Sequence, residues 1–310
     1  MLEGGLFVTH PAPLAYKPNA ELGFSLLSDL HIGCANVDHD QIDRELDLAY
    51  TRKDRILING DIADLILTKD HKRYSPSALH PRLQGRADLV NAALDFAYEI
   101  LYPYASRIDV IGIGNHESKA IHHHDFDFVS ELVKKLRTGV RHCNTVYGGY
   151  AGFVRYEIQS AAWKTPQSLN FFYWHGAGGG ASASSAAQEF DKKSFVEGAD
   201  VVWFAHKHLR MAYEVERLSP PWTLHEPVPR TRRQWNVRTG SYFHTYPGQT
   251  QEGYARDGRQ ASYAADSLLP PQGRGGARVV LRFGRDTTSA GVPCEKNLRV
   301  EFSSLTSQKV

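Results

Sequence analysis

Short apolar runs in this chain end repeatedly in Asp, Asn or His, and this feature limits the folds open to it. GFSLLS leads into Asp-Leu-His, RILIN into Gly-Asp, IDVIGI into Gly-Asn-His, LNFFYW into His, and ADVVWFA into His-Lys-His. Apolar runs of about four to eight residues that stop at turn residues are typical of buried strands. Because functional side chains gather at the carboxyl ends of strands in α/β sheets, we expect one site there. The polar residues at these five ends are Asp29, His31, Asp61, Asn115, His116, His175, His206 and His208.

Segments with helical spacing alternate with the strands in the first half of the chain, and strand-like runs dominate after residue 145. The helical segments are residues 40–50, 88–105 and 125–137. Alternating strands and helices followed mainly by strands predict an α/β sandwich of two sheets. We expect one domain over residues 1–310, in which the β-rich part from about residue 211 completes the second sheet.

Composition excludes several classes of protein. The chain has 310 residues, of which 42% are hydrophobic, and this is enough to build a large core. Its 36 basic and 34 acidic residues leave a net charge of +2, unlike a strongly basic nucleic-acid coat or an acidic tail protein. The three cysteines show no C-x-x-C spacing, and no apolar run approaches the roughly 20 residues of a membrane span. We therefore expect a cytoplasmic protein without a disulfide framework or a membrane segment.

The side chains at the strand ends have the chemistry of metal ligands. Carboxylate oxygens and imidazole nitrogens suit divalent first-row metals. Asp29 and His31 are two residues apart, as are His206 and His208, so each pair can converge on one ion just beyond its strand. Asp61 could bridge two ions, and two metals about 3.5–4 Å apart can hold a phosphate for in-line displacement. Each block alone also fits a turn or a helix cap, but five blocks in one order favour a joint metal site.

The blocks SDLH, GDIAD, GNHE, His175 and AHKH, in this order, resemble the five sequence blocks of the calcineurin-like metallophosphoesterases, in particular bacterial and phage members. The resemblance runs from residue 23 to about residue 210 and into the strand that contains Thr239. Ala205 stands where the family usually has glycine, which puts the local backbone shape in question. The resemblance implies a four-layer fold, with two sheets flanked by helices, and hydrolysis of phosphoester bonds by a metal-bound hydroxide.

The resemblance also implies a role for each residue in these blocks. The residues expected to hold two metals are Asp29, His31 and His208 for one ion, Asn115, His175 and His206 for the other, and Asp61 as the bridge. His116 would protonate or hydrogen-bond the leaving oxygen, and Asp64 would orient His116 or another histidine. We expect two divalent ions, manganese first, although iron, zinc, nickel or cobalt would also suit these ligands.

The polar segment that follows Asp64 is a candidate substrate contact. Lys72 and Arg73 would bind a substrate phosphate, and Tyr74 would stack on a base or sugar. A solvated charged loop fits the same residues equally well. A second basic run, at residues 230–238, could track a nucleic-acid backbone, but we expect it to form a solvated edge strand.

Two further segments are expected to be loops near the site. The triplet His122–His124 favours a solvated polar loop; alternatively, His123 reaches a substrate phosphate. Residues 176–187, GAGGGASASSAA, match the dinucleotide-binding pattern G-x-G-x-x-[GA] only loosely, because no βαβ unit with an acidic second strand follows. This segment favours a flexible loop beside His175.

The predicted function is a dinuclear metal-dependent phosphoester hydrolase, and within that class a phosphodiesterase. Two alternatives stay open, namely a metal-dependent nuclease acting on DNA or RNA and a catalytically weak scaffold or binding protein with the same fold. A nucleic-acid-binding module is a third, which predicts salt-sensitive DNA binding that survives a chelator. The chain contains no G-x-x-x-x-G-K-[ST] phosphate loop and no G-x-S-x-G elbow, so the predicted hydrolase neither depends on ATP nor uses a serine nucleophile.

Overall fold

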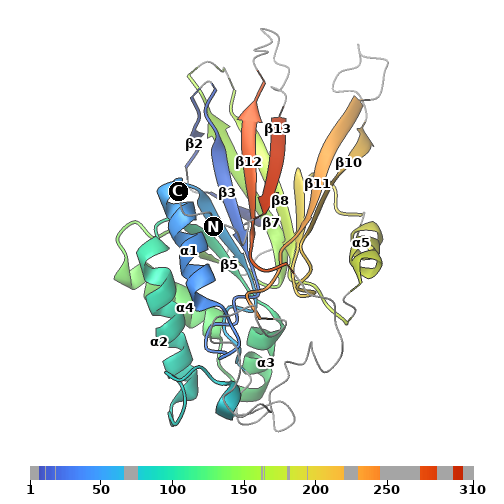
Figure 1. The fold of residues 1–310 in the computed structure, drawn as a ribbon. Coiled ribbons are helices and arrows are strands. Elements are labelled where there is room, and N and C mark those ends of the chain that lie inside the picture. The colour runs from blue at the N-terminus through green and yellow to red at the C-terminus, as the bar shows by residue number, and fades with distance from the viewer. Residues whose placement is uncertain are drawn as a thin grey trace, which may run out of the picture.

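Two β-sheets pack face to face, and helices cover their outer faces (Figure 1). The computed structural model describes residues 7–10, 12–17, 19–65, 76–161, 163, 165–179, 182–193, 195–219, 230–244, 273–284 and 296–302, without the side chains of residues 123, 124, 219 and 230. Within these ranges, the α/β class with two sheets, predicted from the order of strands and helices, is confirmed.

The first sheet has the strand order β13-β12-β3-β4-β5-β6. Its strands are β3 (Leu22–Leu27), β4 (Arg55–Asn59), β5 (Ile108–Gly112), β6 (Val146–Tyr147), β12 (Ala277–Phe283) and β13 (Lys296–Phe302). Strands β3 to β6 run parallel, whereas β12 is antiparallel to β3 and β13 is antiparallel to β12. Strands β4 and β5 are buried along almost their whole length, which explains why they are continuous apolar runs.

The second sheet has the order β1-β7-β8-β9-β11-β10, with β2 also paired to β7. Its strands are β1 (Phe7–Thr9), β2 (Leu14–Ala15), β7 (Ala151–Gln159), β8 (Gln167–Trp174), β9 (Val201–Phe204), β10 (Met211–Ser219) and β11 (Arg230–Arg238). Strand β7 alternates strictly between half-buried and buried residues, and Val154, Tyr156 and Ile158 face the core. This alternation is typical of a strand that buries one face.

The strands after residue 211 divide between the two sheets. Strands β10 and β11 lie in the second sheet, as expected, but β12 and β13 extend the first sheet. The expectation that this whole part completes the second sheet is therefore wrong for β12 and β13. Strand β11 lies between β9 and β10, so the basic run at residues 230–238 is not an edge strand. Arg238 at its end is fully buried and donates to the Glu189 carboxylate, and this pairing allows an arginine inside the fold.

The helices begin and end at recognisable signals. They are α1 (His39–Thr51), α2 (Leu89–Leu101), α3 (Asn115–His124), α4 (Phe128–Gly139) and α5 (Ala183–Lys192), with short 3₁₀ turns at Pro76–Ala78 and Tyr102–Tyr104. Asp38 caps α1 by accepting from Gln41 N, and Asp127 caps α4 by accepting from Ser130 N, as short polar side chains do before a helix. The helices predicted at residues 40–50, 88–105 and 125–137 are confirmed.

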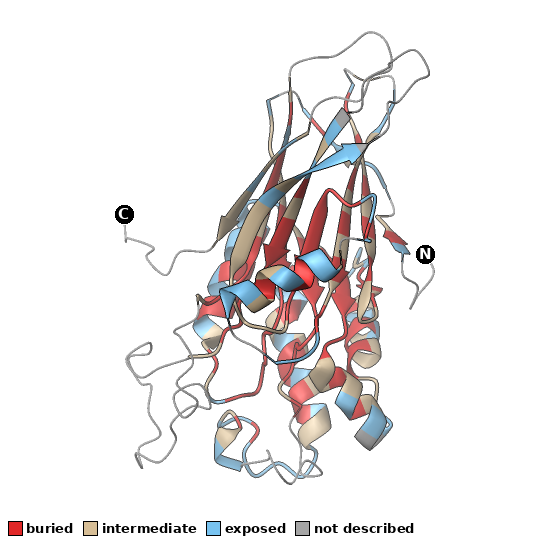
Figure 2. Ribbon diagram, turned by 90° about the vertical axis from the view of Figure 1, so that its right-hand side faces the viewer, coloured by how far each residue is buried: buried red, intermediate tan, exposed pale blue. Residues whose placement is uncertain are grey.

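Three hydrophobic clusters separate the layers. The first lies between the first sheet and helices α1, α2 and α4 and includes Ile42 and Phe96. The second fills the space between the sheets around Trp203. The third lies between the second sheet and α5, where Phe190 stacks on Phe204 at 4.3 Å between ring centroids. Buried residues follow the strands and the inner sides of the helices in Figure 2, so the order helix, sheet, sheet, helix gives the expected four layers.

Two segments expected to be loops are helical instead. The triplet His122–His124 ends α3, which stops where Asp125 turns into the left-handed region at φ 51°. No Gly or Pro interrupts the chain between Asn115 and this turn, so nothing breaks the helix earlier. Residues 183–187 begin α5, because Ser182 accepts from Ser185 N as its cap and Phe190 anchors the helix on the second sheet. Of the described residues in GAGGGASASSAA, those before Ser182 (176–179) are loop.

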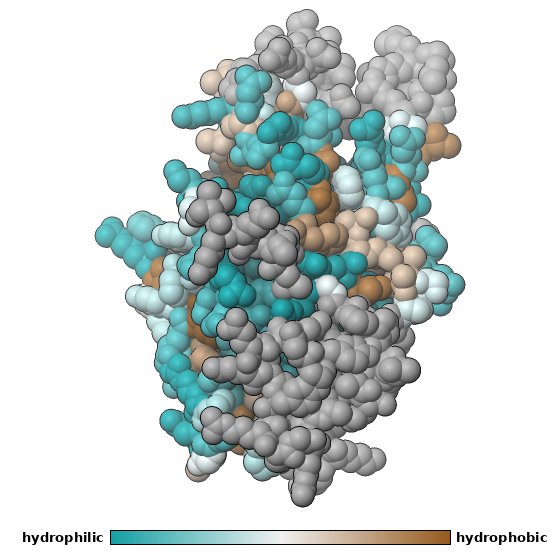
Figure 3. Space-filling view, viewed as in Figure 1, coloured by the Kyte–Doolittle hydropathy of each residue, from teal (hydrophilic) through white to brown (hydrophobic). Residues whose placement is uncertain are grey.

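The face of the molecule seen in Figure 3 is largely hydrophilic where residues are described, with smaller hydrophobic groups between. Among the described helices none has the length and apolar character needed to cross a membrane.

Candidate metal centre

The polar residues at the five strand ends meet at one end of the sandwich. They follow β3, β4 and β5 of the first sheet and β8 and β9 of the second. Asp29 N donates to Gly60 O and His31 N donates to Asp61 O, each at 3.0 Å, so the chains leaving β3 and β4 stay side by side. His206 N donates to Asp29 Oδ1 at 3.2 Å, which joins the two sheets at this point. The fold therefore brings the predicted ligands together.

The first ligand group consists of Asp29, His31 and His208. One ligand atom of each lies within 4.8 Å of the others, and His208 Nε2 is 3.4 Å from Asp29 Oδ1. Asp29 is fully buried and the His31 ring is nearly so, whereas the His208 side chain is 32% exposed. A cation bound here would be reached from solvent on the His208 side.

The second ligand group consists of Asp61, His175 and His206, whose ligand atoms also lie within 4.8 Å of one another. His175 Nε2 lies 3.2 Å from Asp61 Oδ2. It also lies 3.3 Å from Asn115 Oδ1, so the amide oxygen of Asn115 faces the same point. These are the residues predicted for the second metal.

Asp61 lies between the two groups. Its Oδ2 is 3.2 Å from His175 Nε2 and 3.9 Å from His31 Nε2, one nitrogen from each group. Its other oxygen, Oδ1, accepts a hydrogen bond from His116 N at 2.9 Å, which fixes the orientation of the carboxylate. Asp61 is therefore the carboxylate that lies against both groups and could bridge two ions.

The nitrogens of His31 support a cation at this place. Within the described residues neither ring nitrogen has a hydrogen-bond partner, although both are buried. An unsatisfied buried polar atom costs about 1–3 kcal/mol, so such an atom in a folded chain needs an explanation. A divalent cation bound by Nε2 would supply the missing partner. The donor set of carboxylate, imidazole and amide groups fits a first-row metal.

Backbone carbonyls set the tautomers of two ligand histidines. His175 Nδ1 donates to Asn59 O at 2.8 Å, so Nε2 is the nitrogen directed at Asp61 and Asn115 and the one that would bind a metal. His206 Nε2 donates to Gly178 O at 3.1 Å, which leaves Nδ1 available. Histidine ligands of metals commonly donate their other nitrogen in this way.

The ligand positions also share an unusual backbone. Five of the predicted ligands have φ in the left-handed region that favours glycine, with values of 53°, 45°, 49°, 69° and 55° at Asp29, His31, Asp61, His206 and His208. Such residues cost free energy and cluster at functional sites, where the surrounding structure imposes them. Ala205 is not in this region, and its carbonyl accepts from Arg238 Nη1 at 2.6 Å. The left-handed turn occurs at His206, so the alanine at position 205 is not strained.

The charges of the site favour a cation. Burial alone would raise the pKa of the Asp29 carboxyl, but His208 and His175 hold it below its usual value. Burial likewise opposes the charge of Asp61, yet His175 and His116 keep its pKa well below the usual value. Burial would lower the pKa of His175, but the Asp61 carboxylate raises it to about 9. The carboxylates thus stabilise positive charge at the centre of the ligands.

Glu117 is a residue beside the candidate site that the sequence pattern did not single out. Its buried carboxylate accepts hydrogen bonds from four backbone N–H groups: Gly114 at 2.8 Å, Asp61 at 3.0 Å, Ile62 at 2.6 Å and Ala63 at 3.3 Å. Burial, followed by the nearby Asp61, raises its pKa to about 7. Glu117 therefore holds the chain after β4 against the start of α3. Its place as the last residue of GNHE was the available signal.

Asp64 lies between two histidines. Its Oδ1 is 3.4 Å from His116 Nδ1 and 3.4 Å from His31 Nδ1, without hydrogen-bond geometry at His31. Burial lowers the pKa of His116, so this imidazole favours the neutral form. Asp64 thus lies beside His116 and beside His31 of the first ligand group, and its role in orienting His116 stays a prediction.

The predicted substrate contacts are not placed by the structure. Lys72, Arg73 and Tyr74 lie outside the described residues, and so does the side chain of His123, whose backbone is in α3. Their roles stay predictions. Two aromatic residues that the sequence pattern missed lie at the ligand groups instead. The Phe243 ring is 4.4 Å from the His31 ring and the Tyr150 ring is 5.5 Å from the His175 ring, between centroids.

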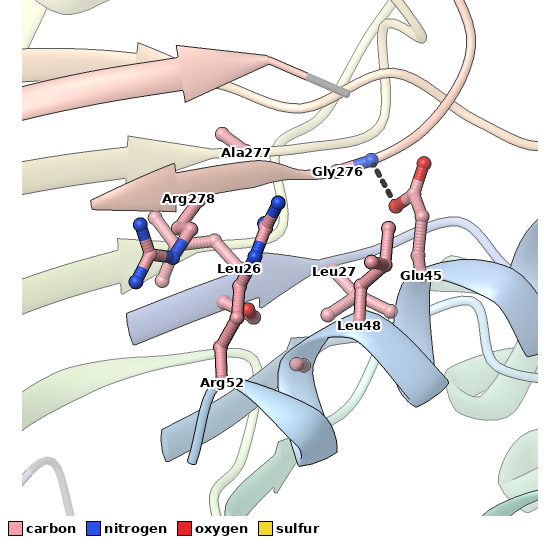
Figure 4. A pocket seen from close by; sticks show the side chains of 10 residues that line it. Leu26, Leu27, Glu45, Leu48, Arg52, Gly276, Ala277 and Arg278 are labelled. Carbon is pink, nitrogen blue, oxygen red and sulfur yellow. Dashed lines mark hydrogen bonds between the residues drawn. The ribbon is translucent and has the colours of Figure 1, made fainter. Parts of the chain in front are cut away.

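A small pocket elsewhere in the fold contains none of the predicted ligands. It lies between α1 and strands β3 and β12 (Figure 4). Its carboxylate, Glu45, accepts from Gly276 N at 2.9 Å and from the Tyr242 hydroxyl at 2.6 Å. Another polar lining residue, Arg278, is bonded to Asp54. Glu45 and Arg278 therefore each have a hydrogen-bond partner. The bond between Glu45 and Gly276 N links α1 to the residue before β12.

Comparisons with known proteins add little. No protein-family model and no curated protein matches the chain. Among solved structures, the chain is similar to a conserved uncharacterised protein from Streptococcus pneumoniae TIGR4 that is described as a predicted phosphoesterase. The two share 14% sequence identity, with 90% of this chain and 99% of that chain covered, and a TM-score of 0.30. A likeness of this strength supports no conclusion about fold or function. Those conclusions come from the chain's own strands and ligand groups.

Proposed function

We propose that this protein is a dinuclear metal-dependent phosphoester hydrolase, and within that class a phosphodiesterase. The observation that carries the proposal is the position of Asp61 Oδ2, which is directed at a nitrogen of each ligand group. A carboxylate that lies between the two groups could hold two adjacent metal ions together. The order of the five blocks, which resembles that of the calcineurin-like metallophosphoesterases, supports the same chemistry.

Two divalent ions, manganese in the first instance, would be held by the two groups with Asn115 completing the second. When bound, such ions polarise a phosphoryl oxygen and lower the pKa of water to about 7. The chain's own residues fix the ligands beforehand, because carbonyls set the tautomers of His175 and His206 and Glu117 holds the turn after β4. This arrangement lowers the reorganisation that binding and reaction require.

His116 would act on the leaving oxygen. Its side chain is 11% exposed, so one edge is open to a substrate, while its Nδ1 faces Asp64. Asp64 would keep the hydrogen on Nδ1 and leave Nε2 to hold or deliver a proton at the leaving group. A role as scaffold is less well supported, because every ligand position is filled by a residue able to bind metal. A cytoplasmic location is part of the proposal and is supported by the free thiols of Cys34 and Cys143.

The test is hydrolysis of bis-p-nitrophenyl phosphate and p-nitrophenyl phosphate by metal-stripped protein, with Mn²⁺ restored. We expect turnover that depends on metal, prefers the diester and falls at least about 100-fold in Asp61→Asn. Asp95→Asn, which changes an exposed carboxylate on α2, is the matched control and should keep full activity. Turnover that survives in Asp61→Asn would contradict the proposal. Two bound ions with no turnover on either ester would favour a binding protein.

A further inference from the structure

We propose that Tyr150 is a positioning residue of the second ligand group, which acts by holding the turn Gly176–Gly178 against His206. The inference rests on the proposed function, because it concerns the metal that Asp61, His175 and His206 would bind. Tyr150 lies just before β7 and belongs to none of the five sequence blocks.

Tyr150 reaches the second ligand group in three ways. Its carbonyl accepts a hydrogen bond from His175 N at 3.0 Å. Its hydroxyl donates to Gly176 O at 2.8 Å. Its ring meets the His175 ring edge-on, at 5.5 Å between centroids and an angle of 78°. One residue therefore holds both the ligand His175 and the turn that follows it.

The support behind Tyr150 is itself fixed. Gly148 N donates to Ile111 O at 2.9 Å, and Ile113 N donates to Gly149 O at 2.9 Å. The Tyr173 hydroxyl donates to Gly148 O at 2.6 Å. These bonds tie the residues before Tyr150 to β5 in the first sheet and to β8 in the second. A positioning side chain on such a rigid support can transmit its own placement to a ligand.

The turn held by Tyr150 passes directly beside His206. Gly176 and Gly178 have φ of 107° and 79°, which only glycine adopts without strain. A Cβ at Gly176 would lie 2.9 Å from His206 Cβ, so the turn and the ligand are in close contact. Gly178 O then accepts from His206 Nε2 at 3.1 Å. Without the Tyr150 hydroxyl, the carbonyl of Gly176 loses its partner and the acceptor that fixes the His206 tautomer is no longer held in place.

The test is a Co²⁺ titration of metal-free protein, followed by visible absorption and by metal analysis. Tyr150→Phe keeps the ring and removes only the hydroxyl. We expect the affinity for one of the two bound ions to fall about 10-fold and the affinity for the other to stay unchanged. A 10-fold loss is about the lower end of the range for such supporting contacts. His206→Ala should weaken the same ion, and adding Tyr150→Phe to His206→Ala should have no further effect. Gly176→Ala disturbs the same turn by another route and should also weaken that ion.

Tyr147→Phe is the matched control, because the Tyr147 hydroxyl donates to Asp127 at the cap of α4 and not to the ligand groups. This variant should bind both ions like the wild type. Unchanged binding in Tyr150→Phe would overturn the role of Tyr150 and leave the proposed function intact. Equal weakening of both ions, or the same further loss in the His206→Ala background, would also overturn it. A wild-type protein that binds fewer than two Co²⁺ would instead contradict the dinuclear centre itself.

Discussion

Buried carboxylates occur at both ends of the strands of the first sheet, but their partners differ. At the amino ends each carboxylate is matched by an arginine. Asp109 in β5 accepts from Arg55 Nε at 2.8 Å and also from the Tyr156 hydroxyl, and its Oδ1 lies 3.6 Å from His10 Nε2. Asp54, just before β4, accepts from Arg278 Nε at 2.7 Å and from its Nη2 at 3.0 Å. Such paired, charge-assisted bonds satisfy both partners and leave no place for a ligand.

At the carboxyl ends, carboxylates face imidazoles instead. Asp29 lies beside His208, and Asp61 lies between His175 and His31. An imidazole can bind a proton or a metal, whereas a guanidinium can do neither at ordinary pH. Burial of a carboxylate therefore does not by itself mark a site. Asp54 and Asp109 are each hydrogen-bonded by an arginine, whereas the candidate ligands Asp29 and Asp61 face histidines.

The largest expected effect is on stability at the amino ends. Asp109→Asn keeps the shape of the side chain but removes the charge that pairs with Arg55, whose side chain is only 15% exposed. Leaving one partner of a buried ion pair unmatched costs about 3–5 kcal/mol. We therefore expect the free energy of unfolding of the metal-free protein, measured in urea, to fall by about this amount. Metal binding per folded molecule should not change.

The matched control is Asp95→Asn, which removes an exposed pair with Lys135. Exposed pairs contribute at most about 1 kcal/mol, so this variant should unfold almost like the wild type. Equal losses in the two variants would mean that the Asp109 pair is no more important than a surface pair, and the contrast between the two ends would lose its energetic basis.

The next effect is the stabilisation that metal gives. A ligand that binds only the folded state at 100 times its dissociation constant raises the free energy of unfolding by about 2.7 kcal/mol. We expect Mn²⁺ to raise the urea midpoint of the wild type and of Asp109→Asn, but to leave Asp61→Asn nearly unchanged. If Mn²⁺ stabilises Asp61→Asn as much as the wild type, Asp61 does not bridge the metals.

The fold could be predicted in outline because its signals are local. Apolar runs that end in turn residues revealed β3, β4, β5, β8 and β9, and apolar spacing revealed α1, α2 and α4. Pairing between distant strands leaves no such signal. The sequence does not show that β12 joins β3, since this depends on the antiparallel register from Ala277–Leu26 to Leu281–Leu22. The start of α5 was missed because the segment GAGGGASASSAA consists of Gly, Ala and Ser throughout. Its composition does not mark where the helix begins.

The convergence of the candidate ligands could be predicted because each stands at a strand end, whereas their assignment to two metals came from the resemblance and stays a prediction. The residues that hold these ligands could not be predicted. Glu117 acts through backbone N–H groups of residues 61–63, and any acid at that position would look like part of a helix cap. Tyr150 acts through the hydrogen bond that its hydroxyl donates to the carbonyl of Gly176. Such contacts depend on which segments the fold places together.

Glu117 offers a third kind of buried carboxylate, satisfied by backbone donors alone. Glu117→Gln keeps the size of the side chain, but its amide group presents N–H where the backbone also presents N–H. We expect a loss of about 2 kcal/mol in the free energy of unfolding, within the range for leaving buried donors unsatisfied. Urea unfolding of the metal-free variant measures it. A loss below that of Asp95→Asn would show that these backbone bonds contribute little.

The smallest effect concerns a histidine that forms no ion pair among the described residues. The His39 ring stacks on Phe96, its Nδ1 donates to Val37 O at 3.1 Å, and its Nε2 accepts from Gly33 N at 3.4 Å. Protonation would remove the acceptor that Gly33 needs. Burial, followed by the nearby His80, lowers the pKa of His39 to about 4, below the 6.5 of an unperturbed histidine.

The sign of the pH dependence follows from this lowered pKa. Below pH 6.5 the unfolded chain binds a proton at His39 that the folded chain does not, so stability is full above pH 6.5 and is lost as pH falls toward 4. Between pH 7 and pH 5 we expect this residue to account for about 1–2 kcal/mol of the loss. His39→Gln can keep both hydrogen bonds and should lose less stability over this interval than the wild type, whereas His142→Gln, which changes an exposed histidine, should follow the wild type. Identical pH profiles for all three proteins would mean that the fold does not lower the pKa of His39. His39 would then no longer contrast with His175, whose pKa Asp61 raises in spite of burial.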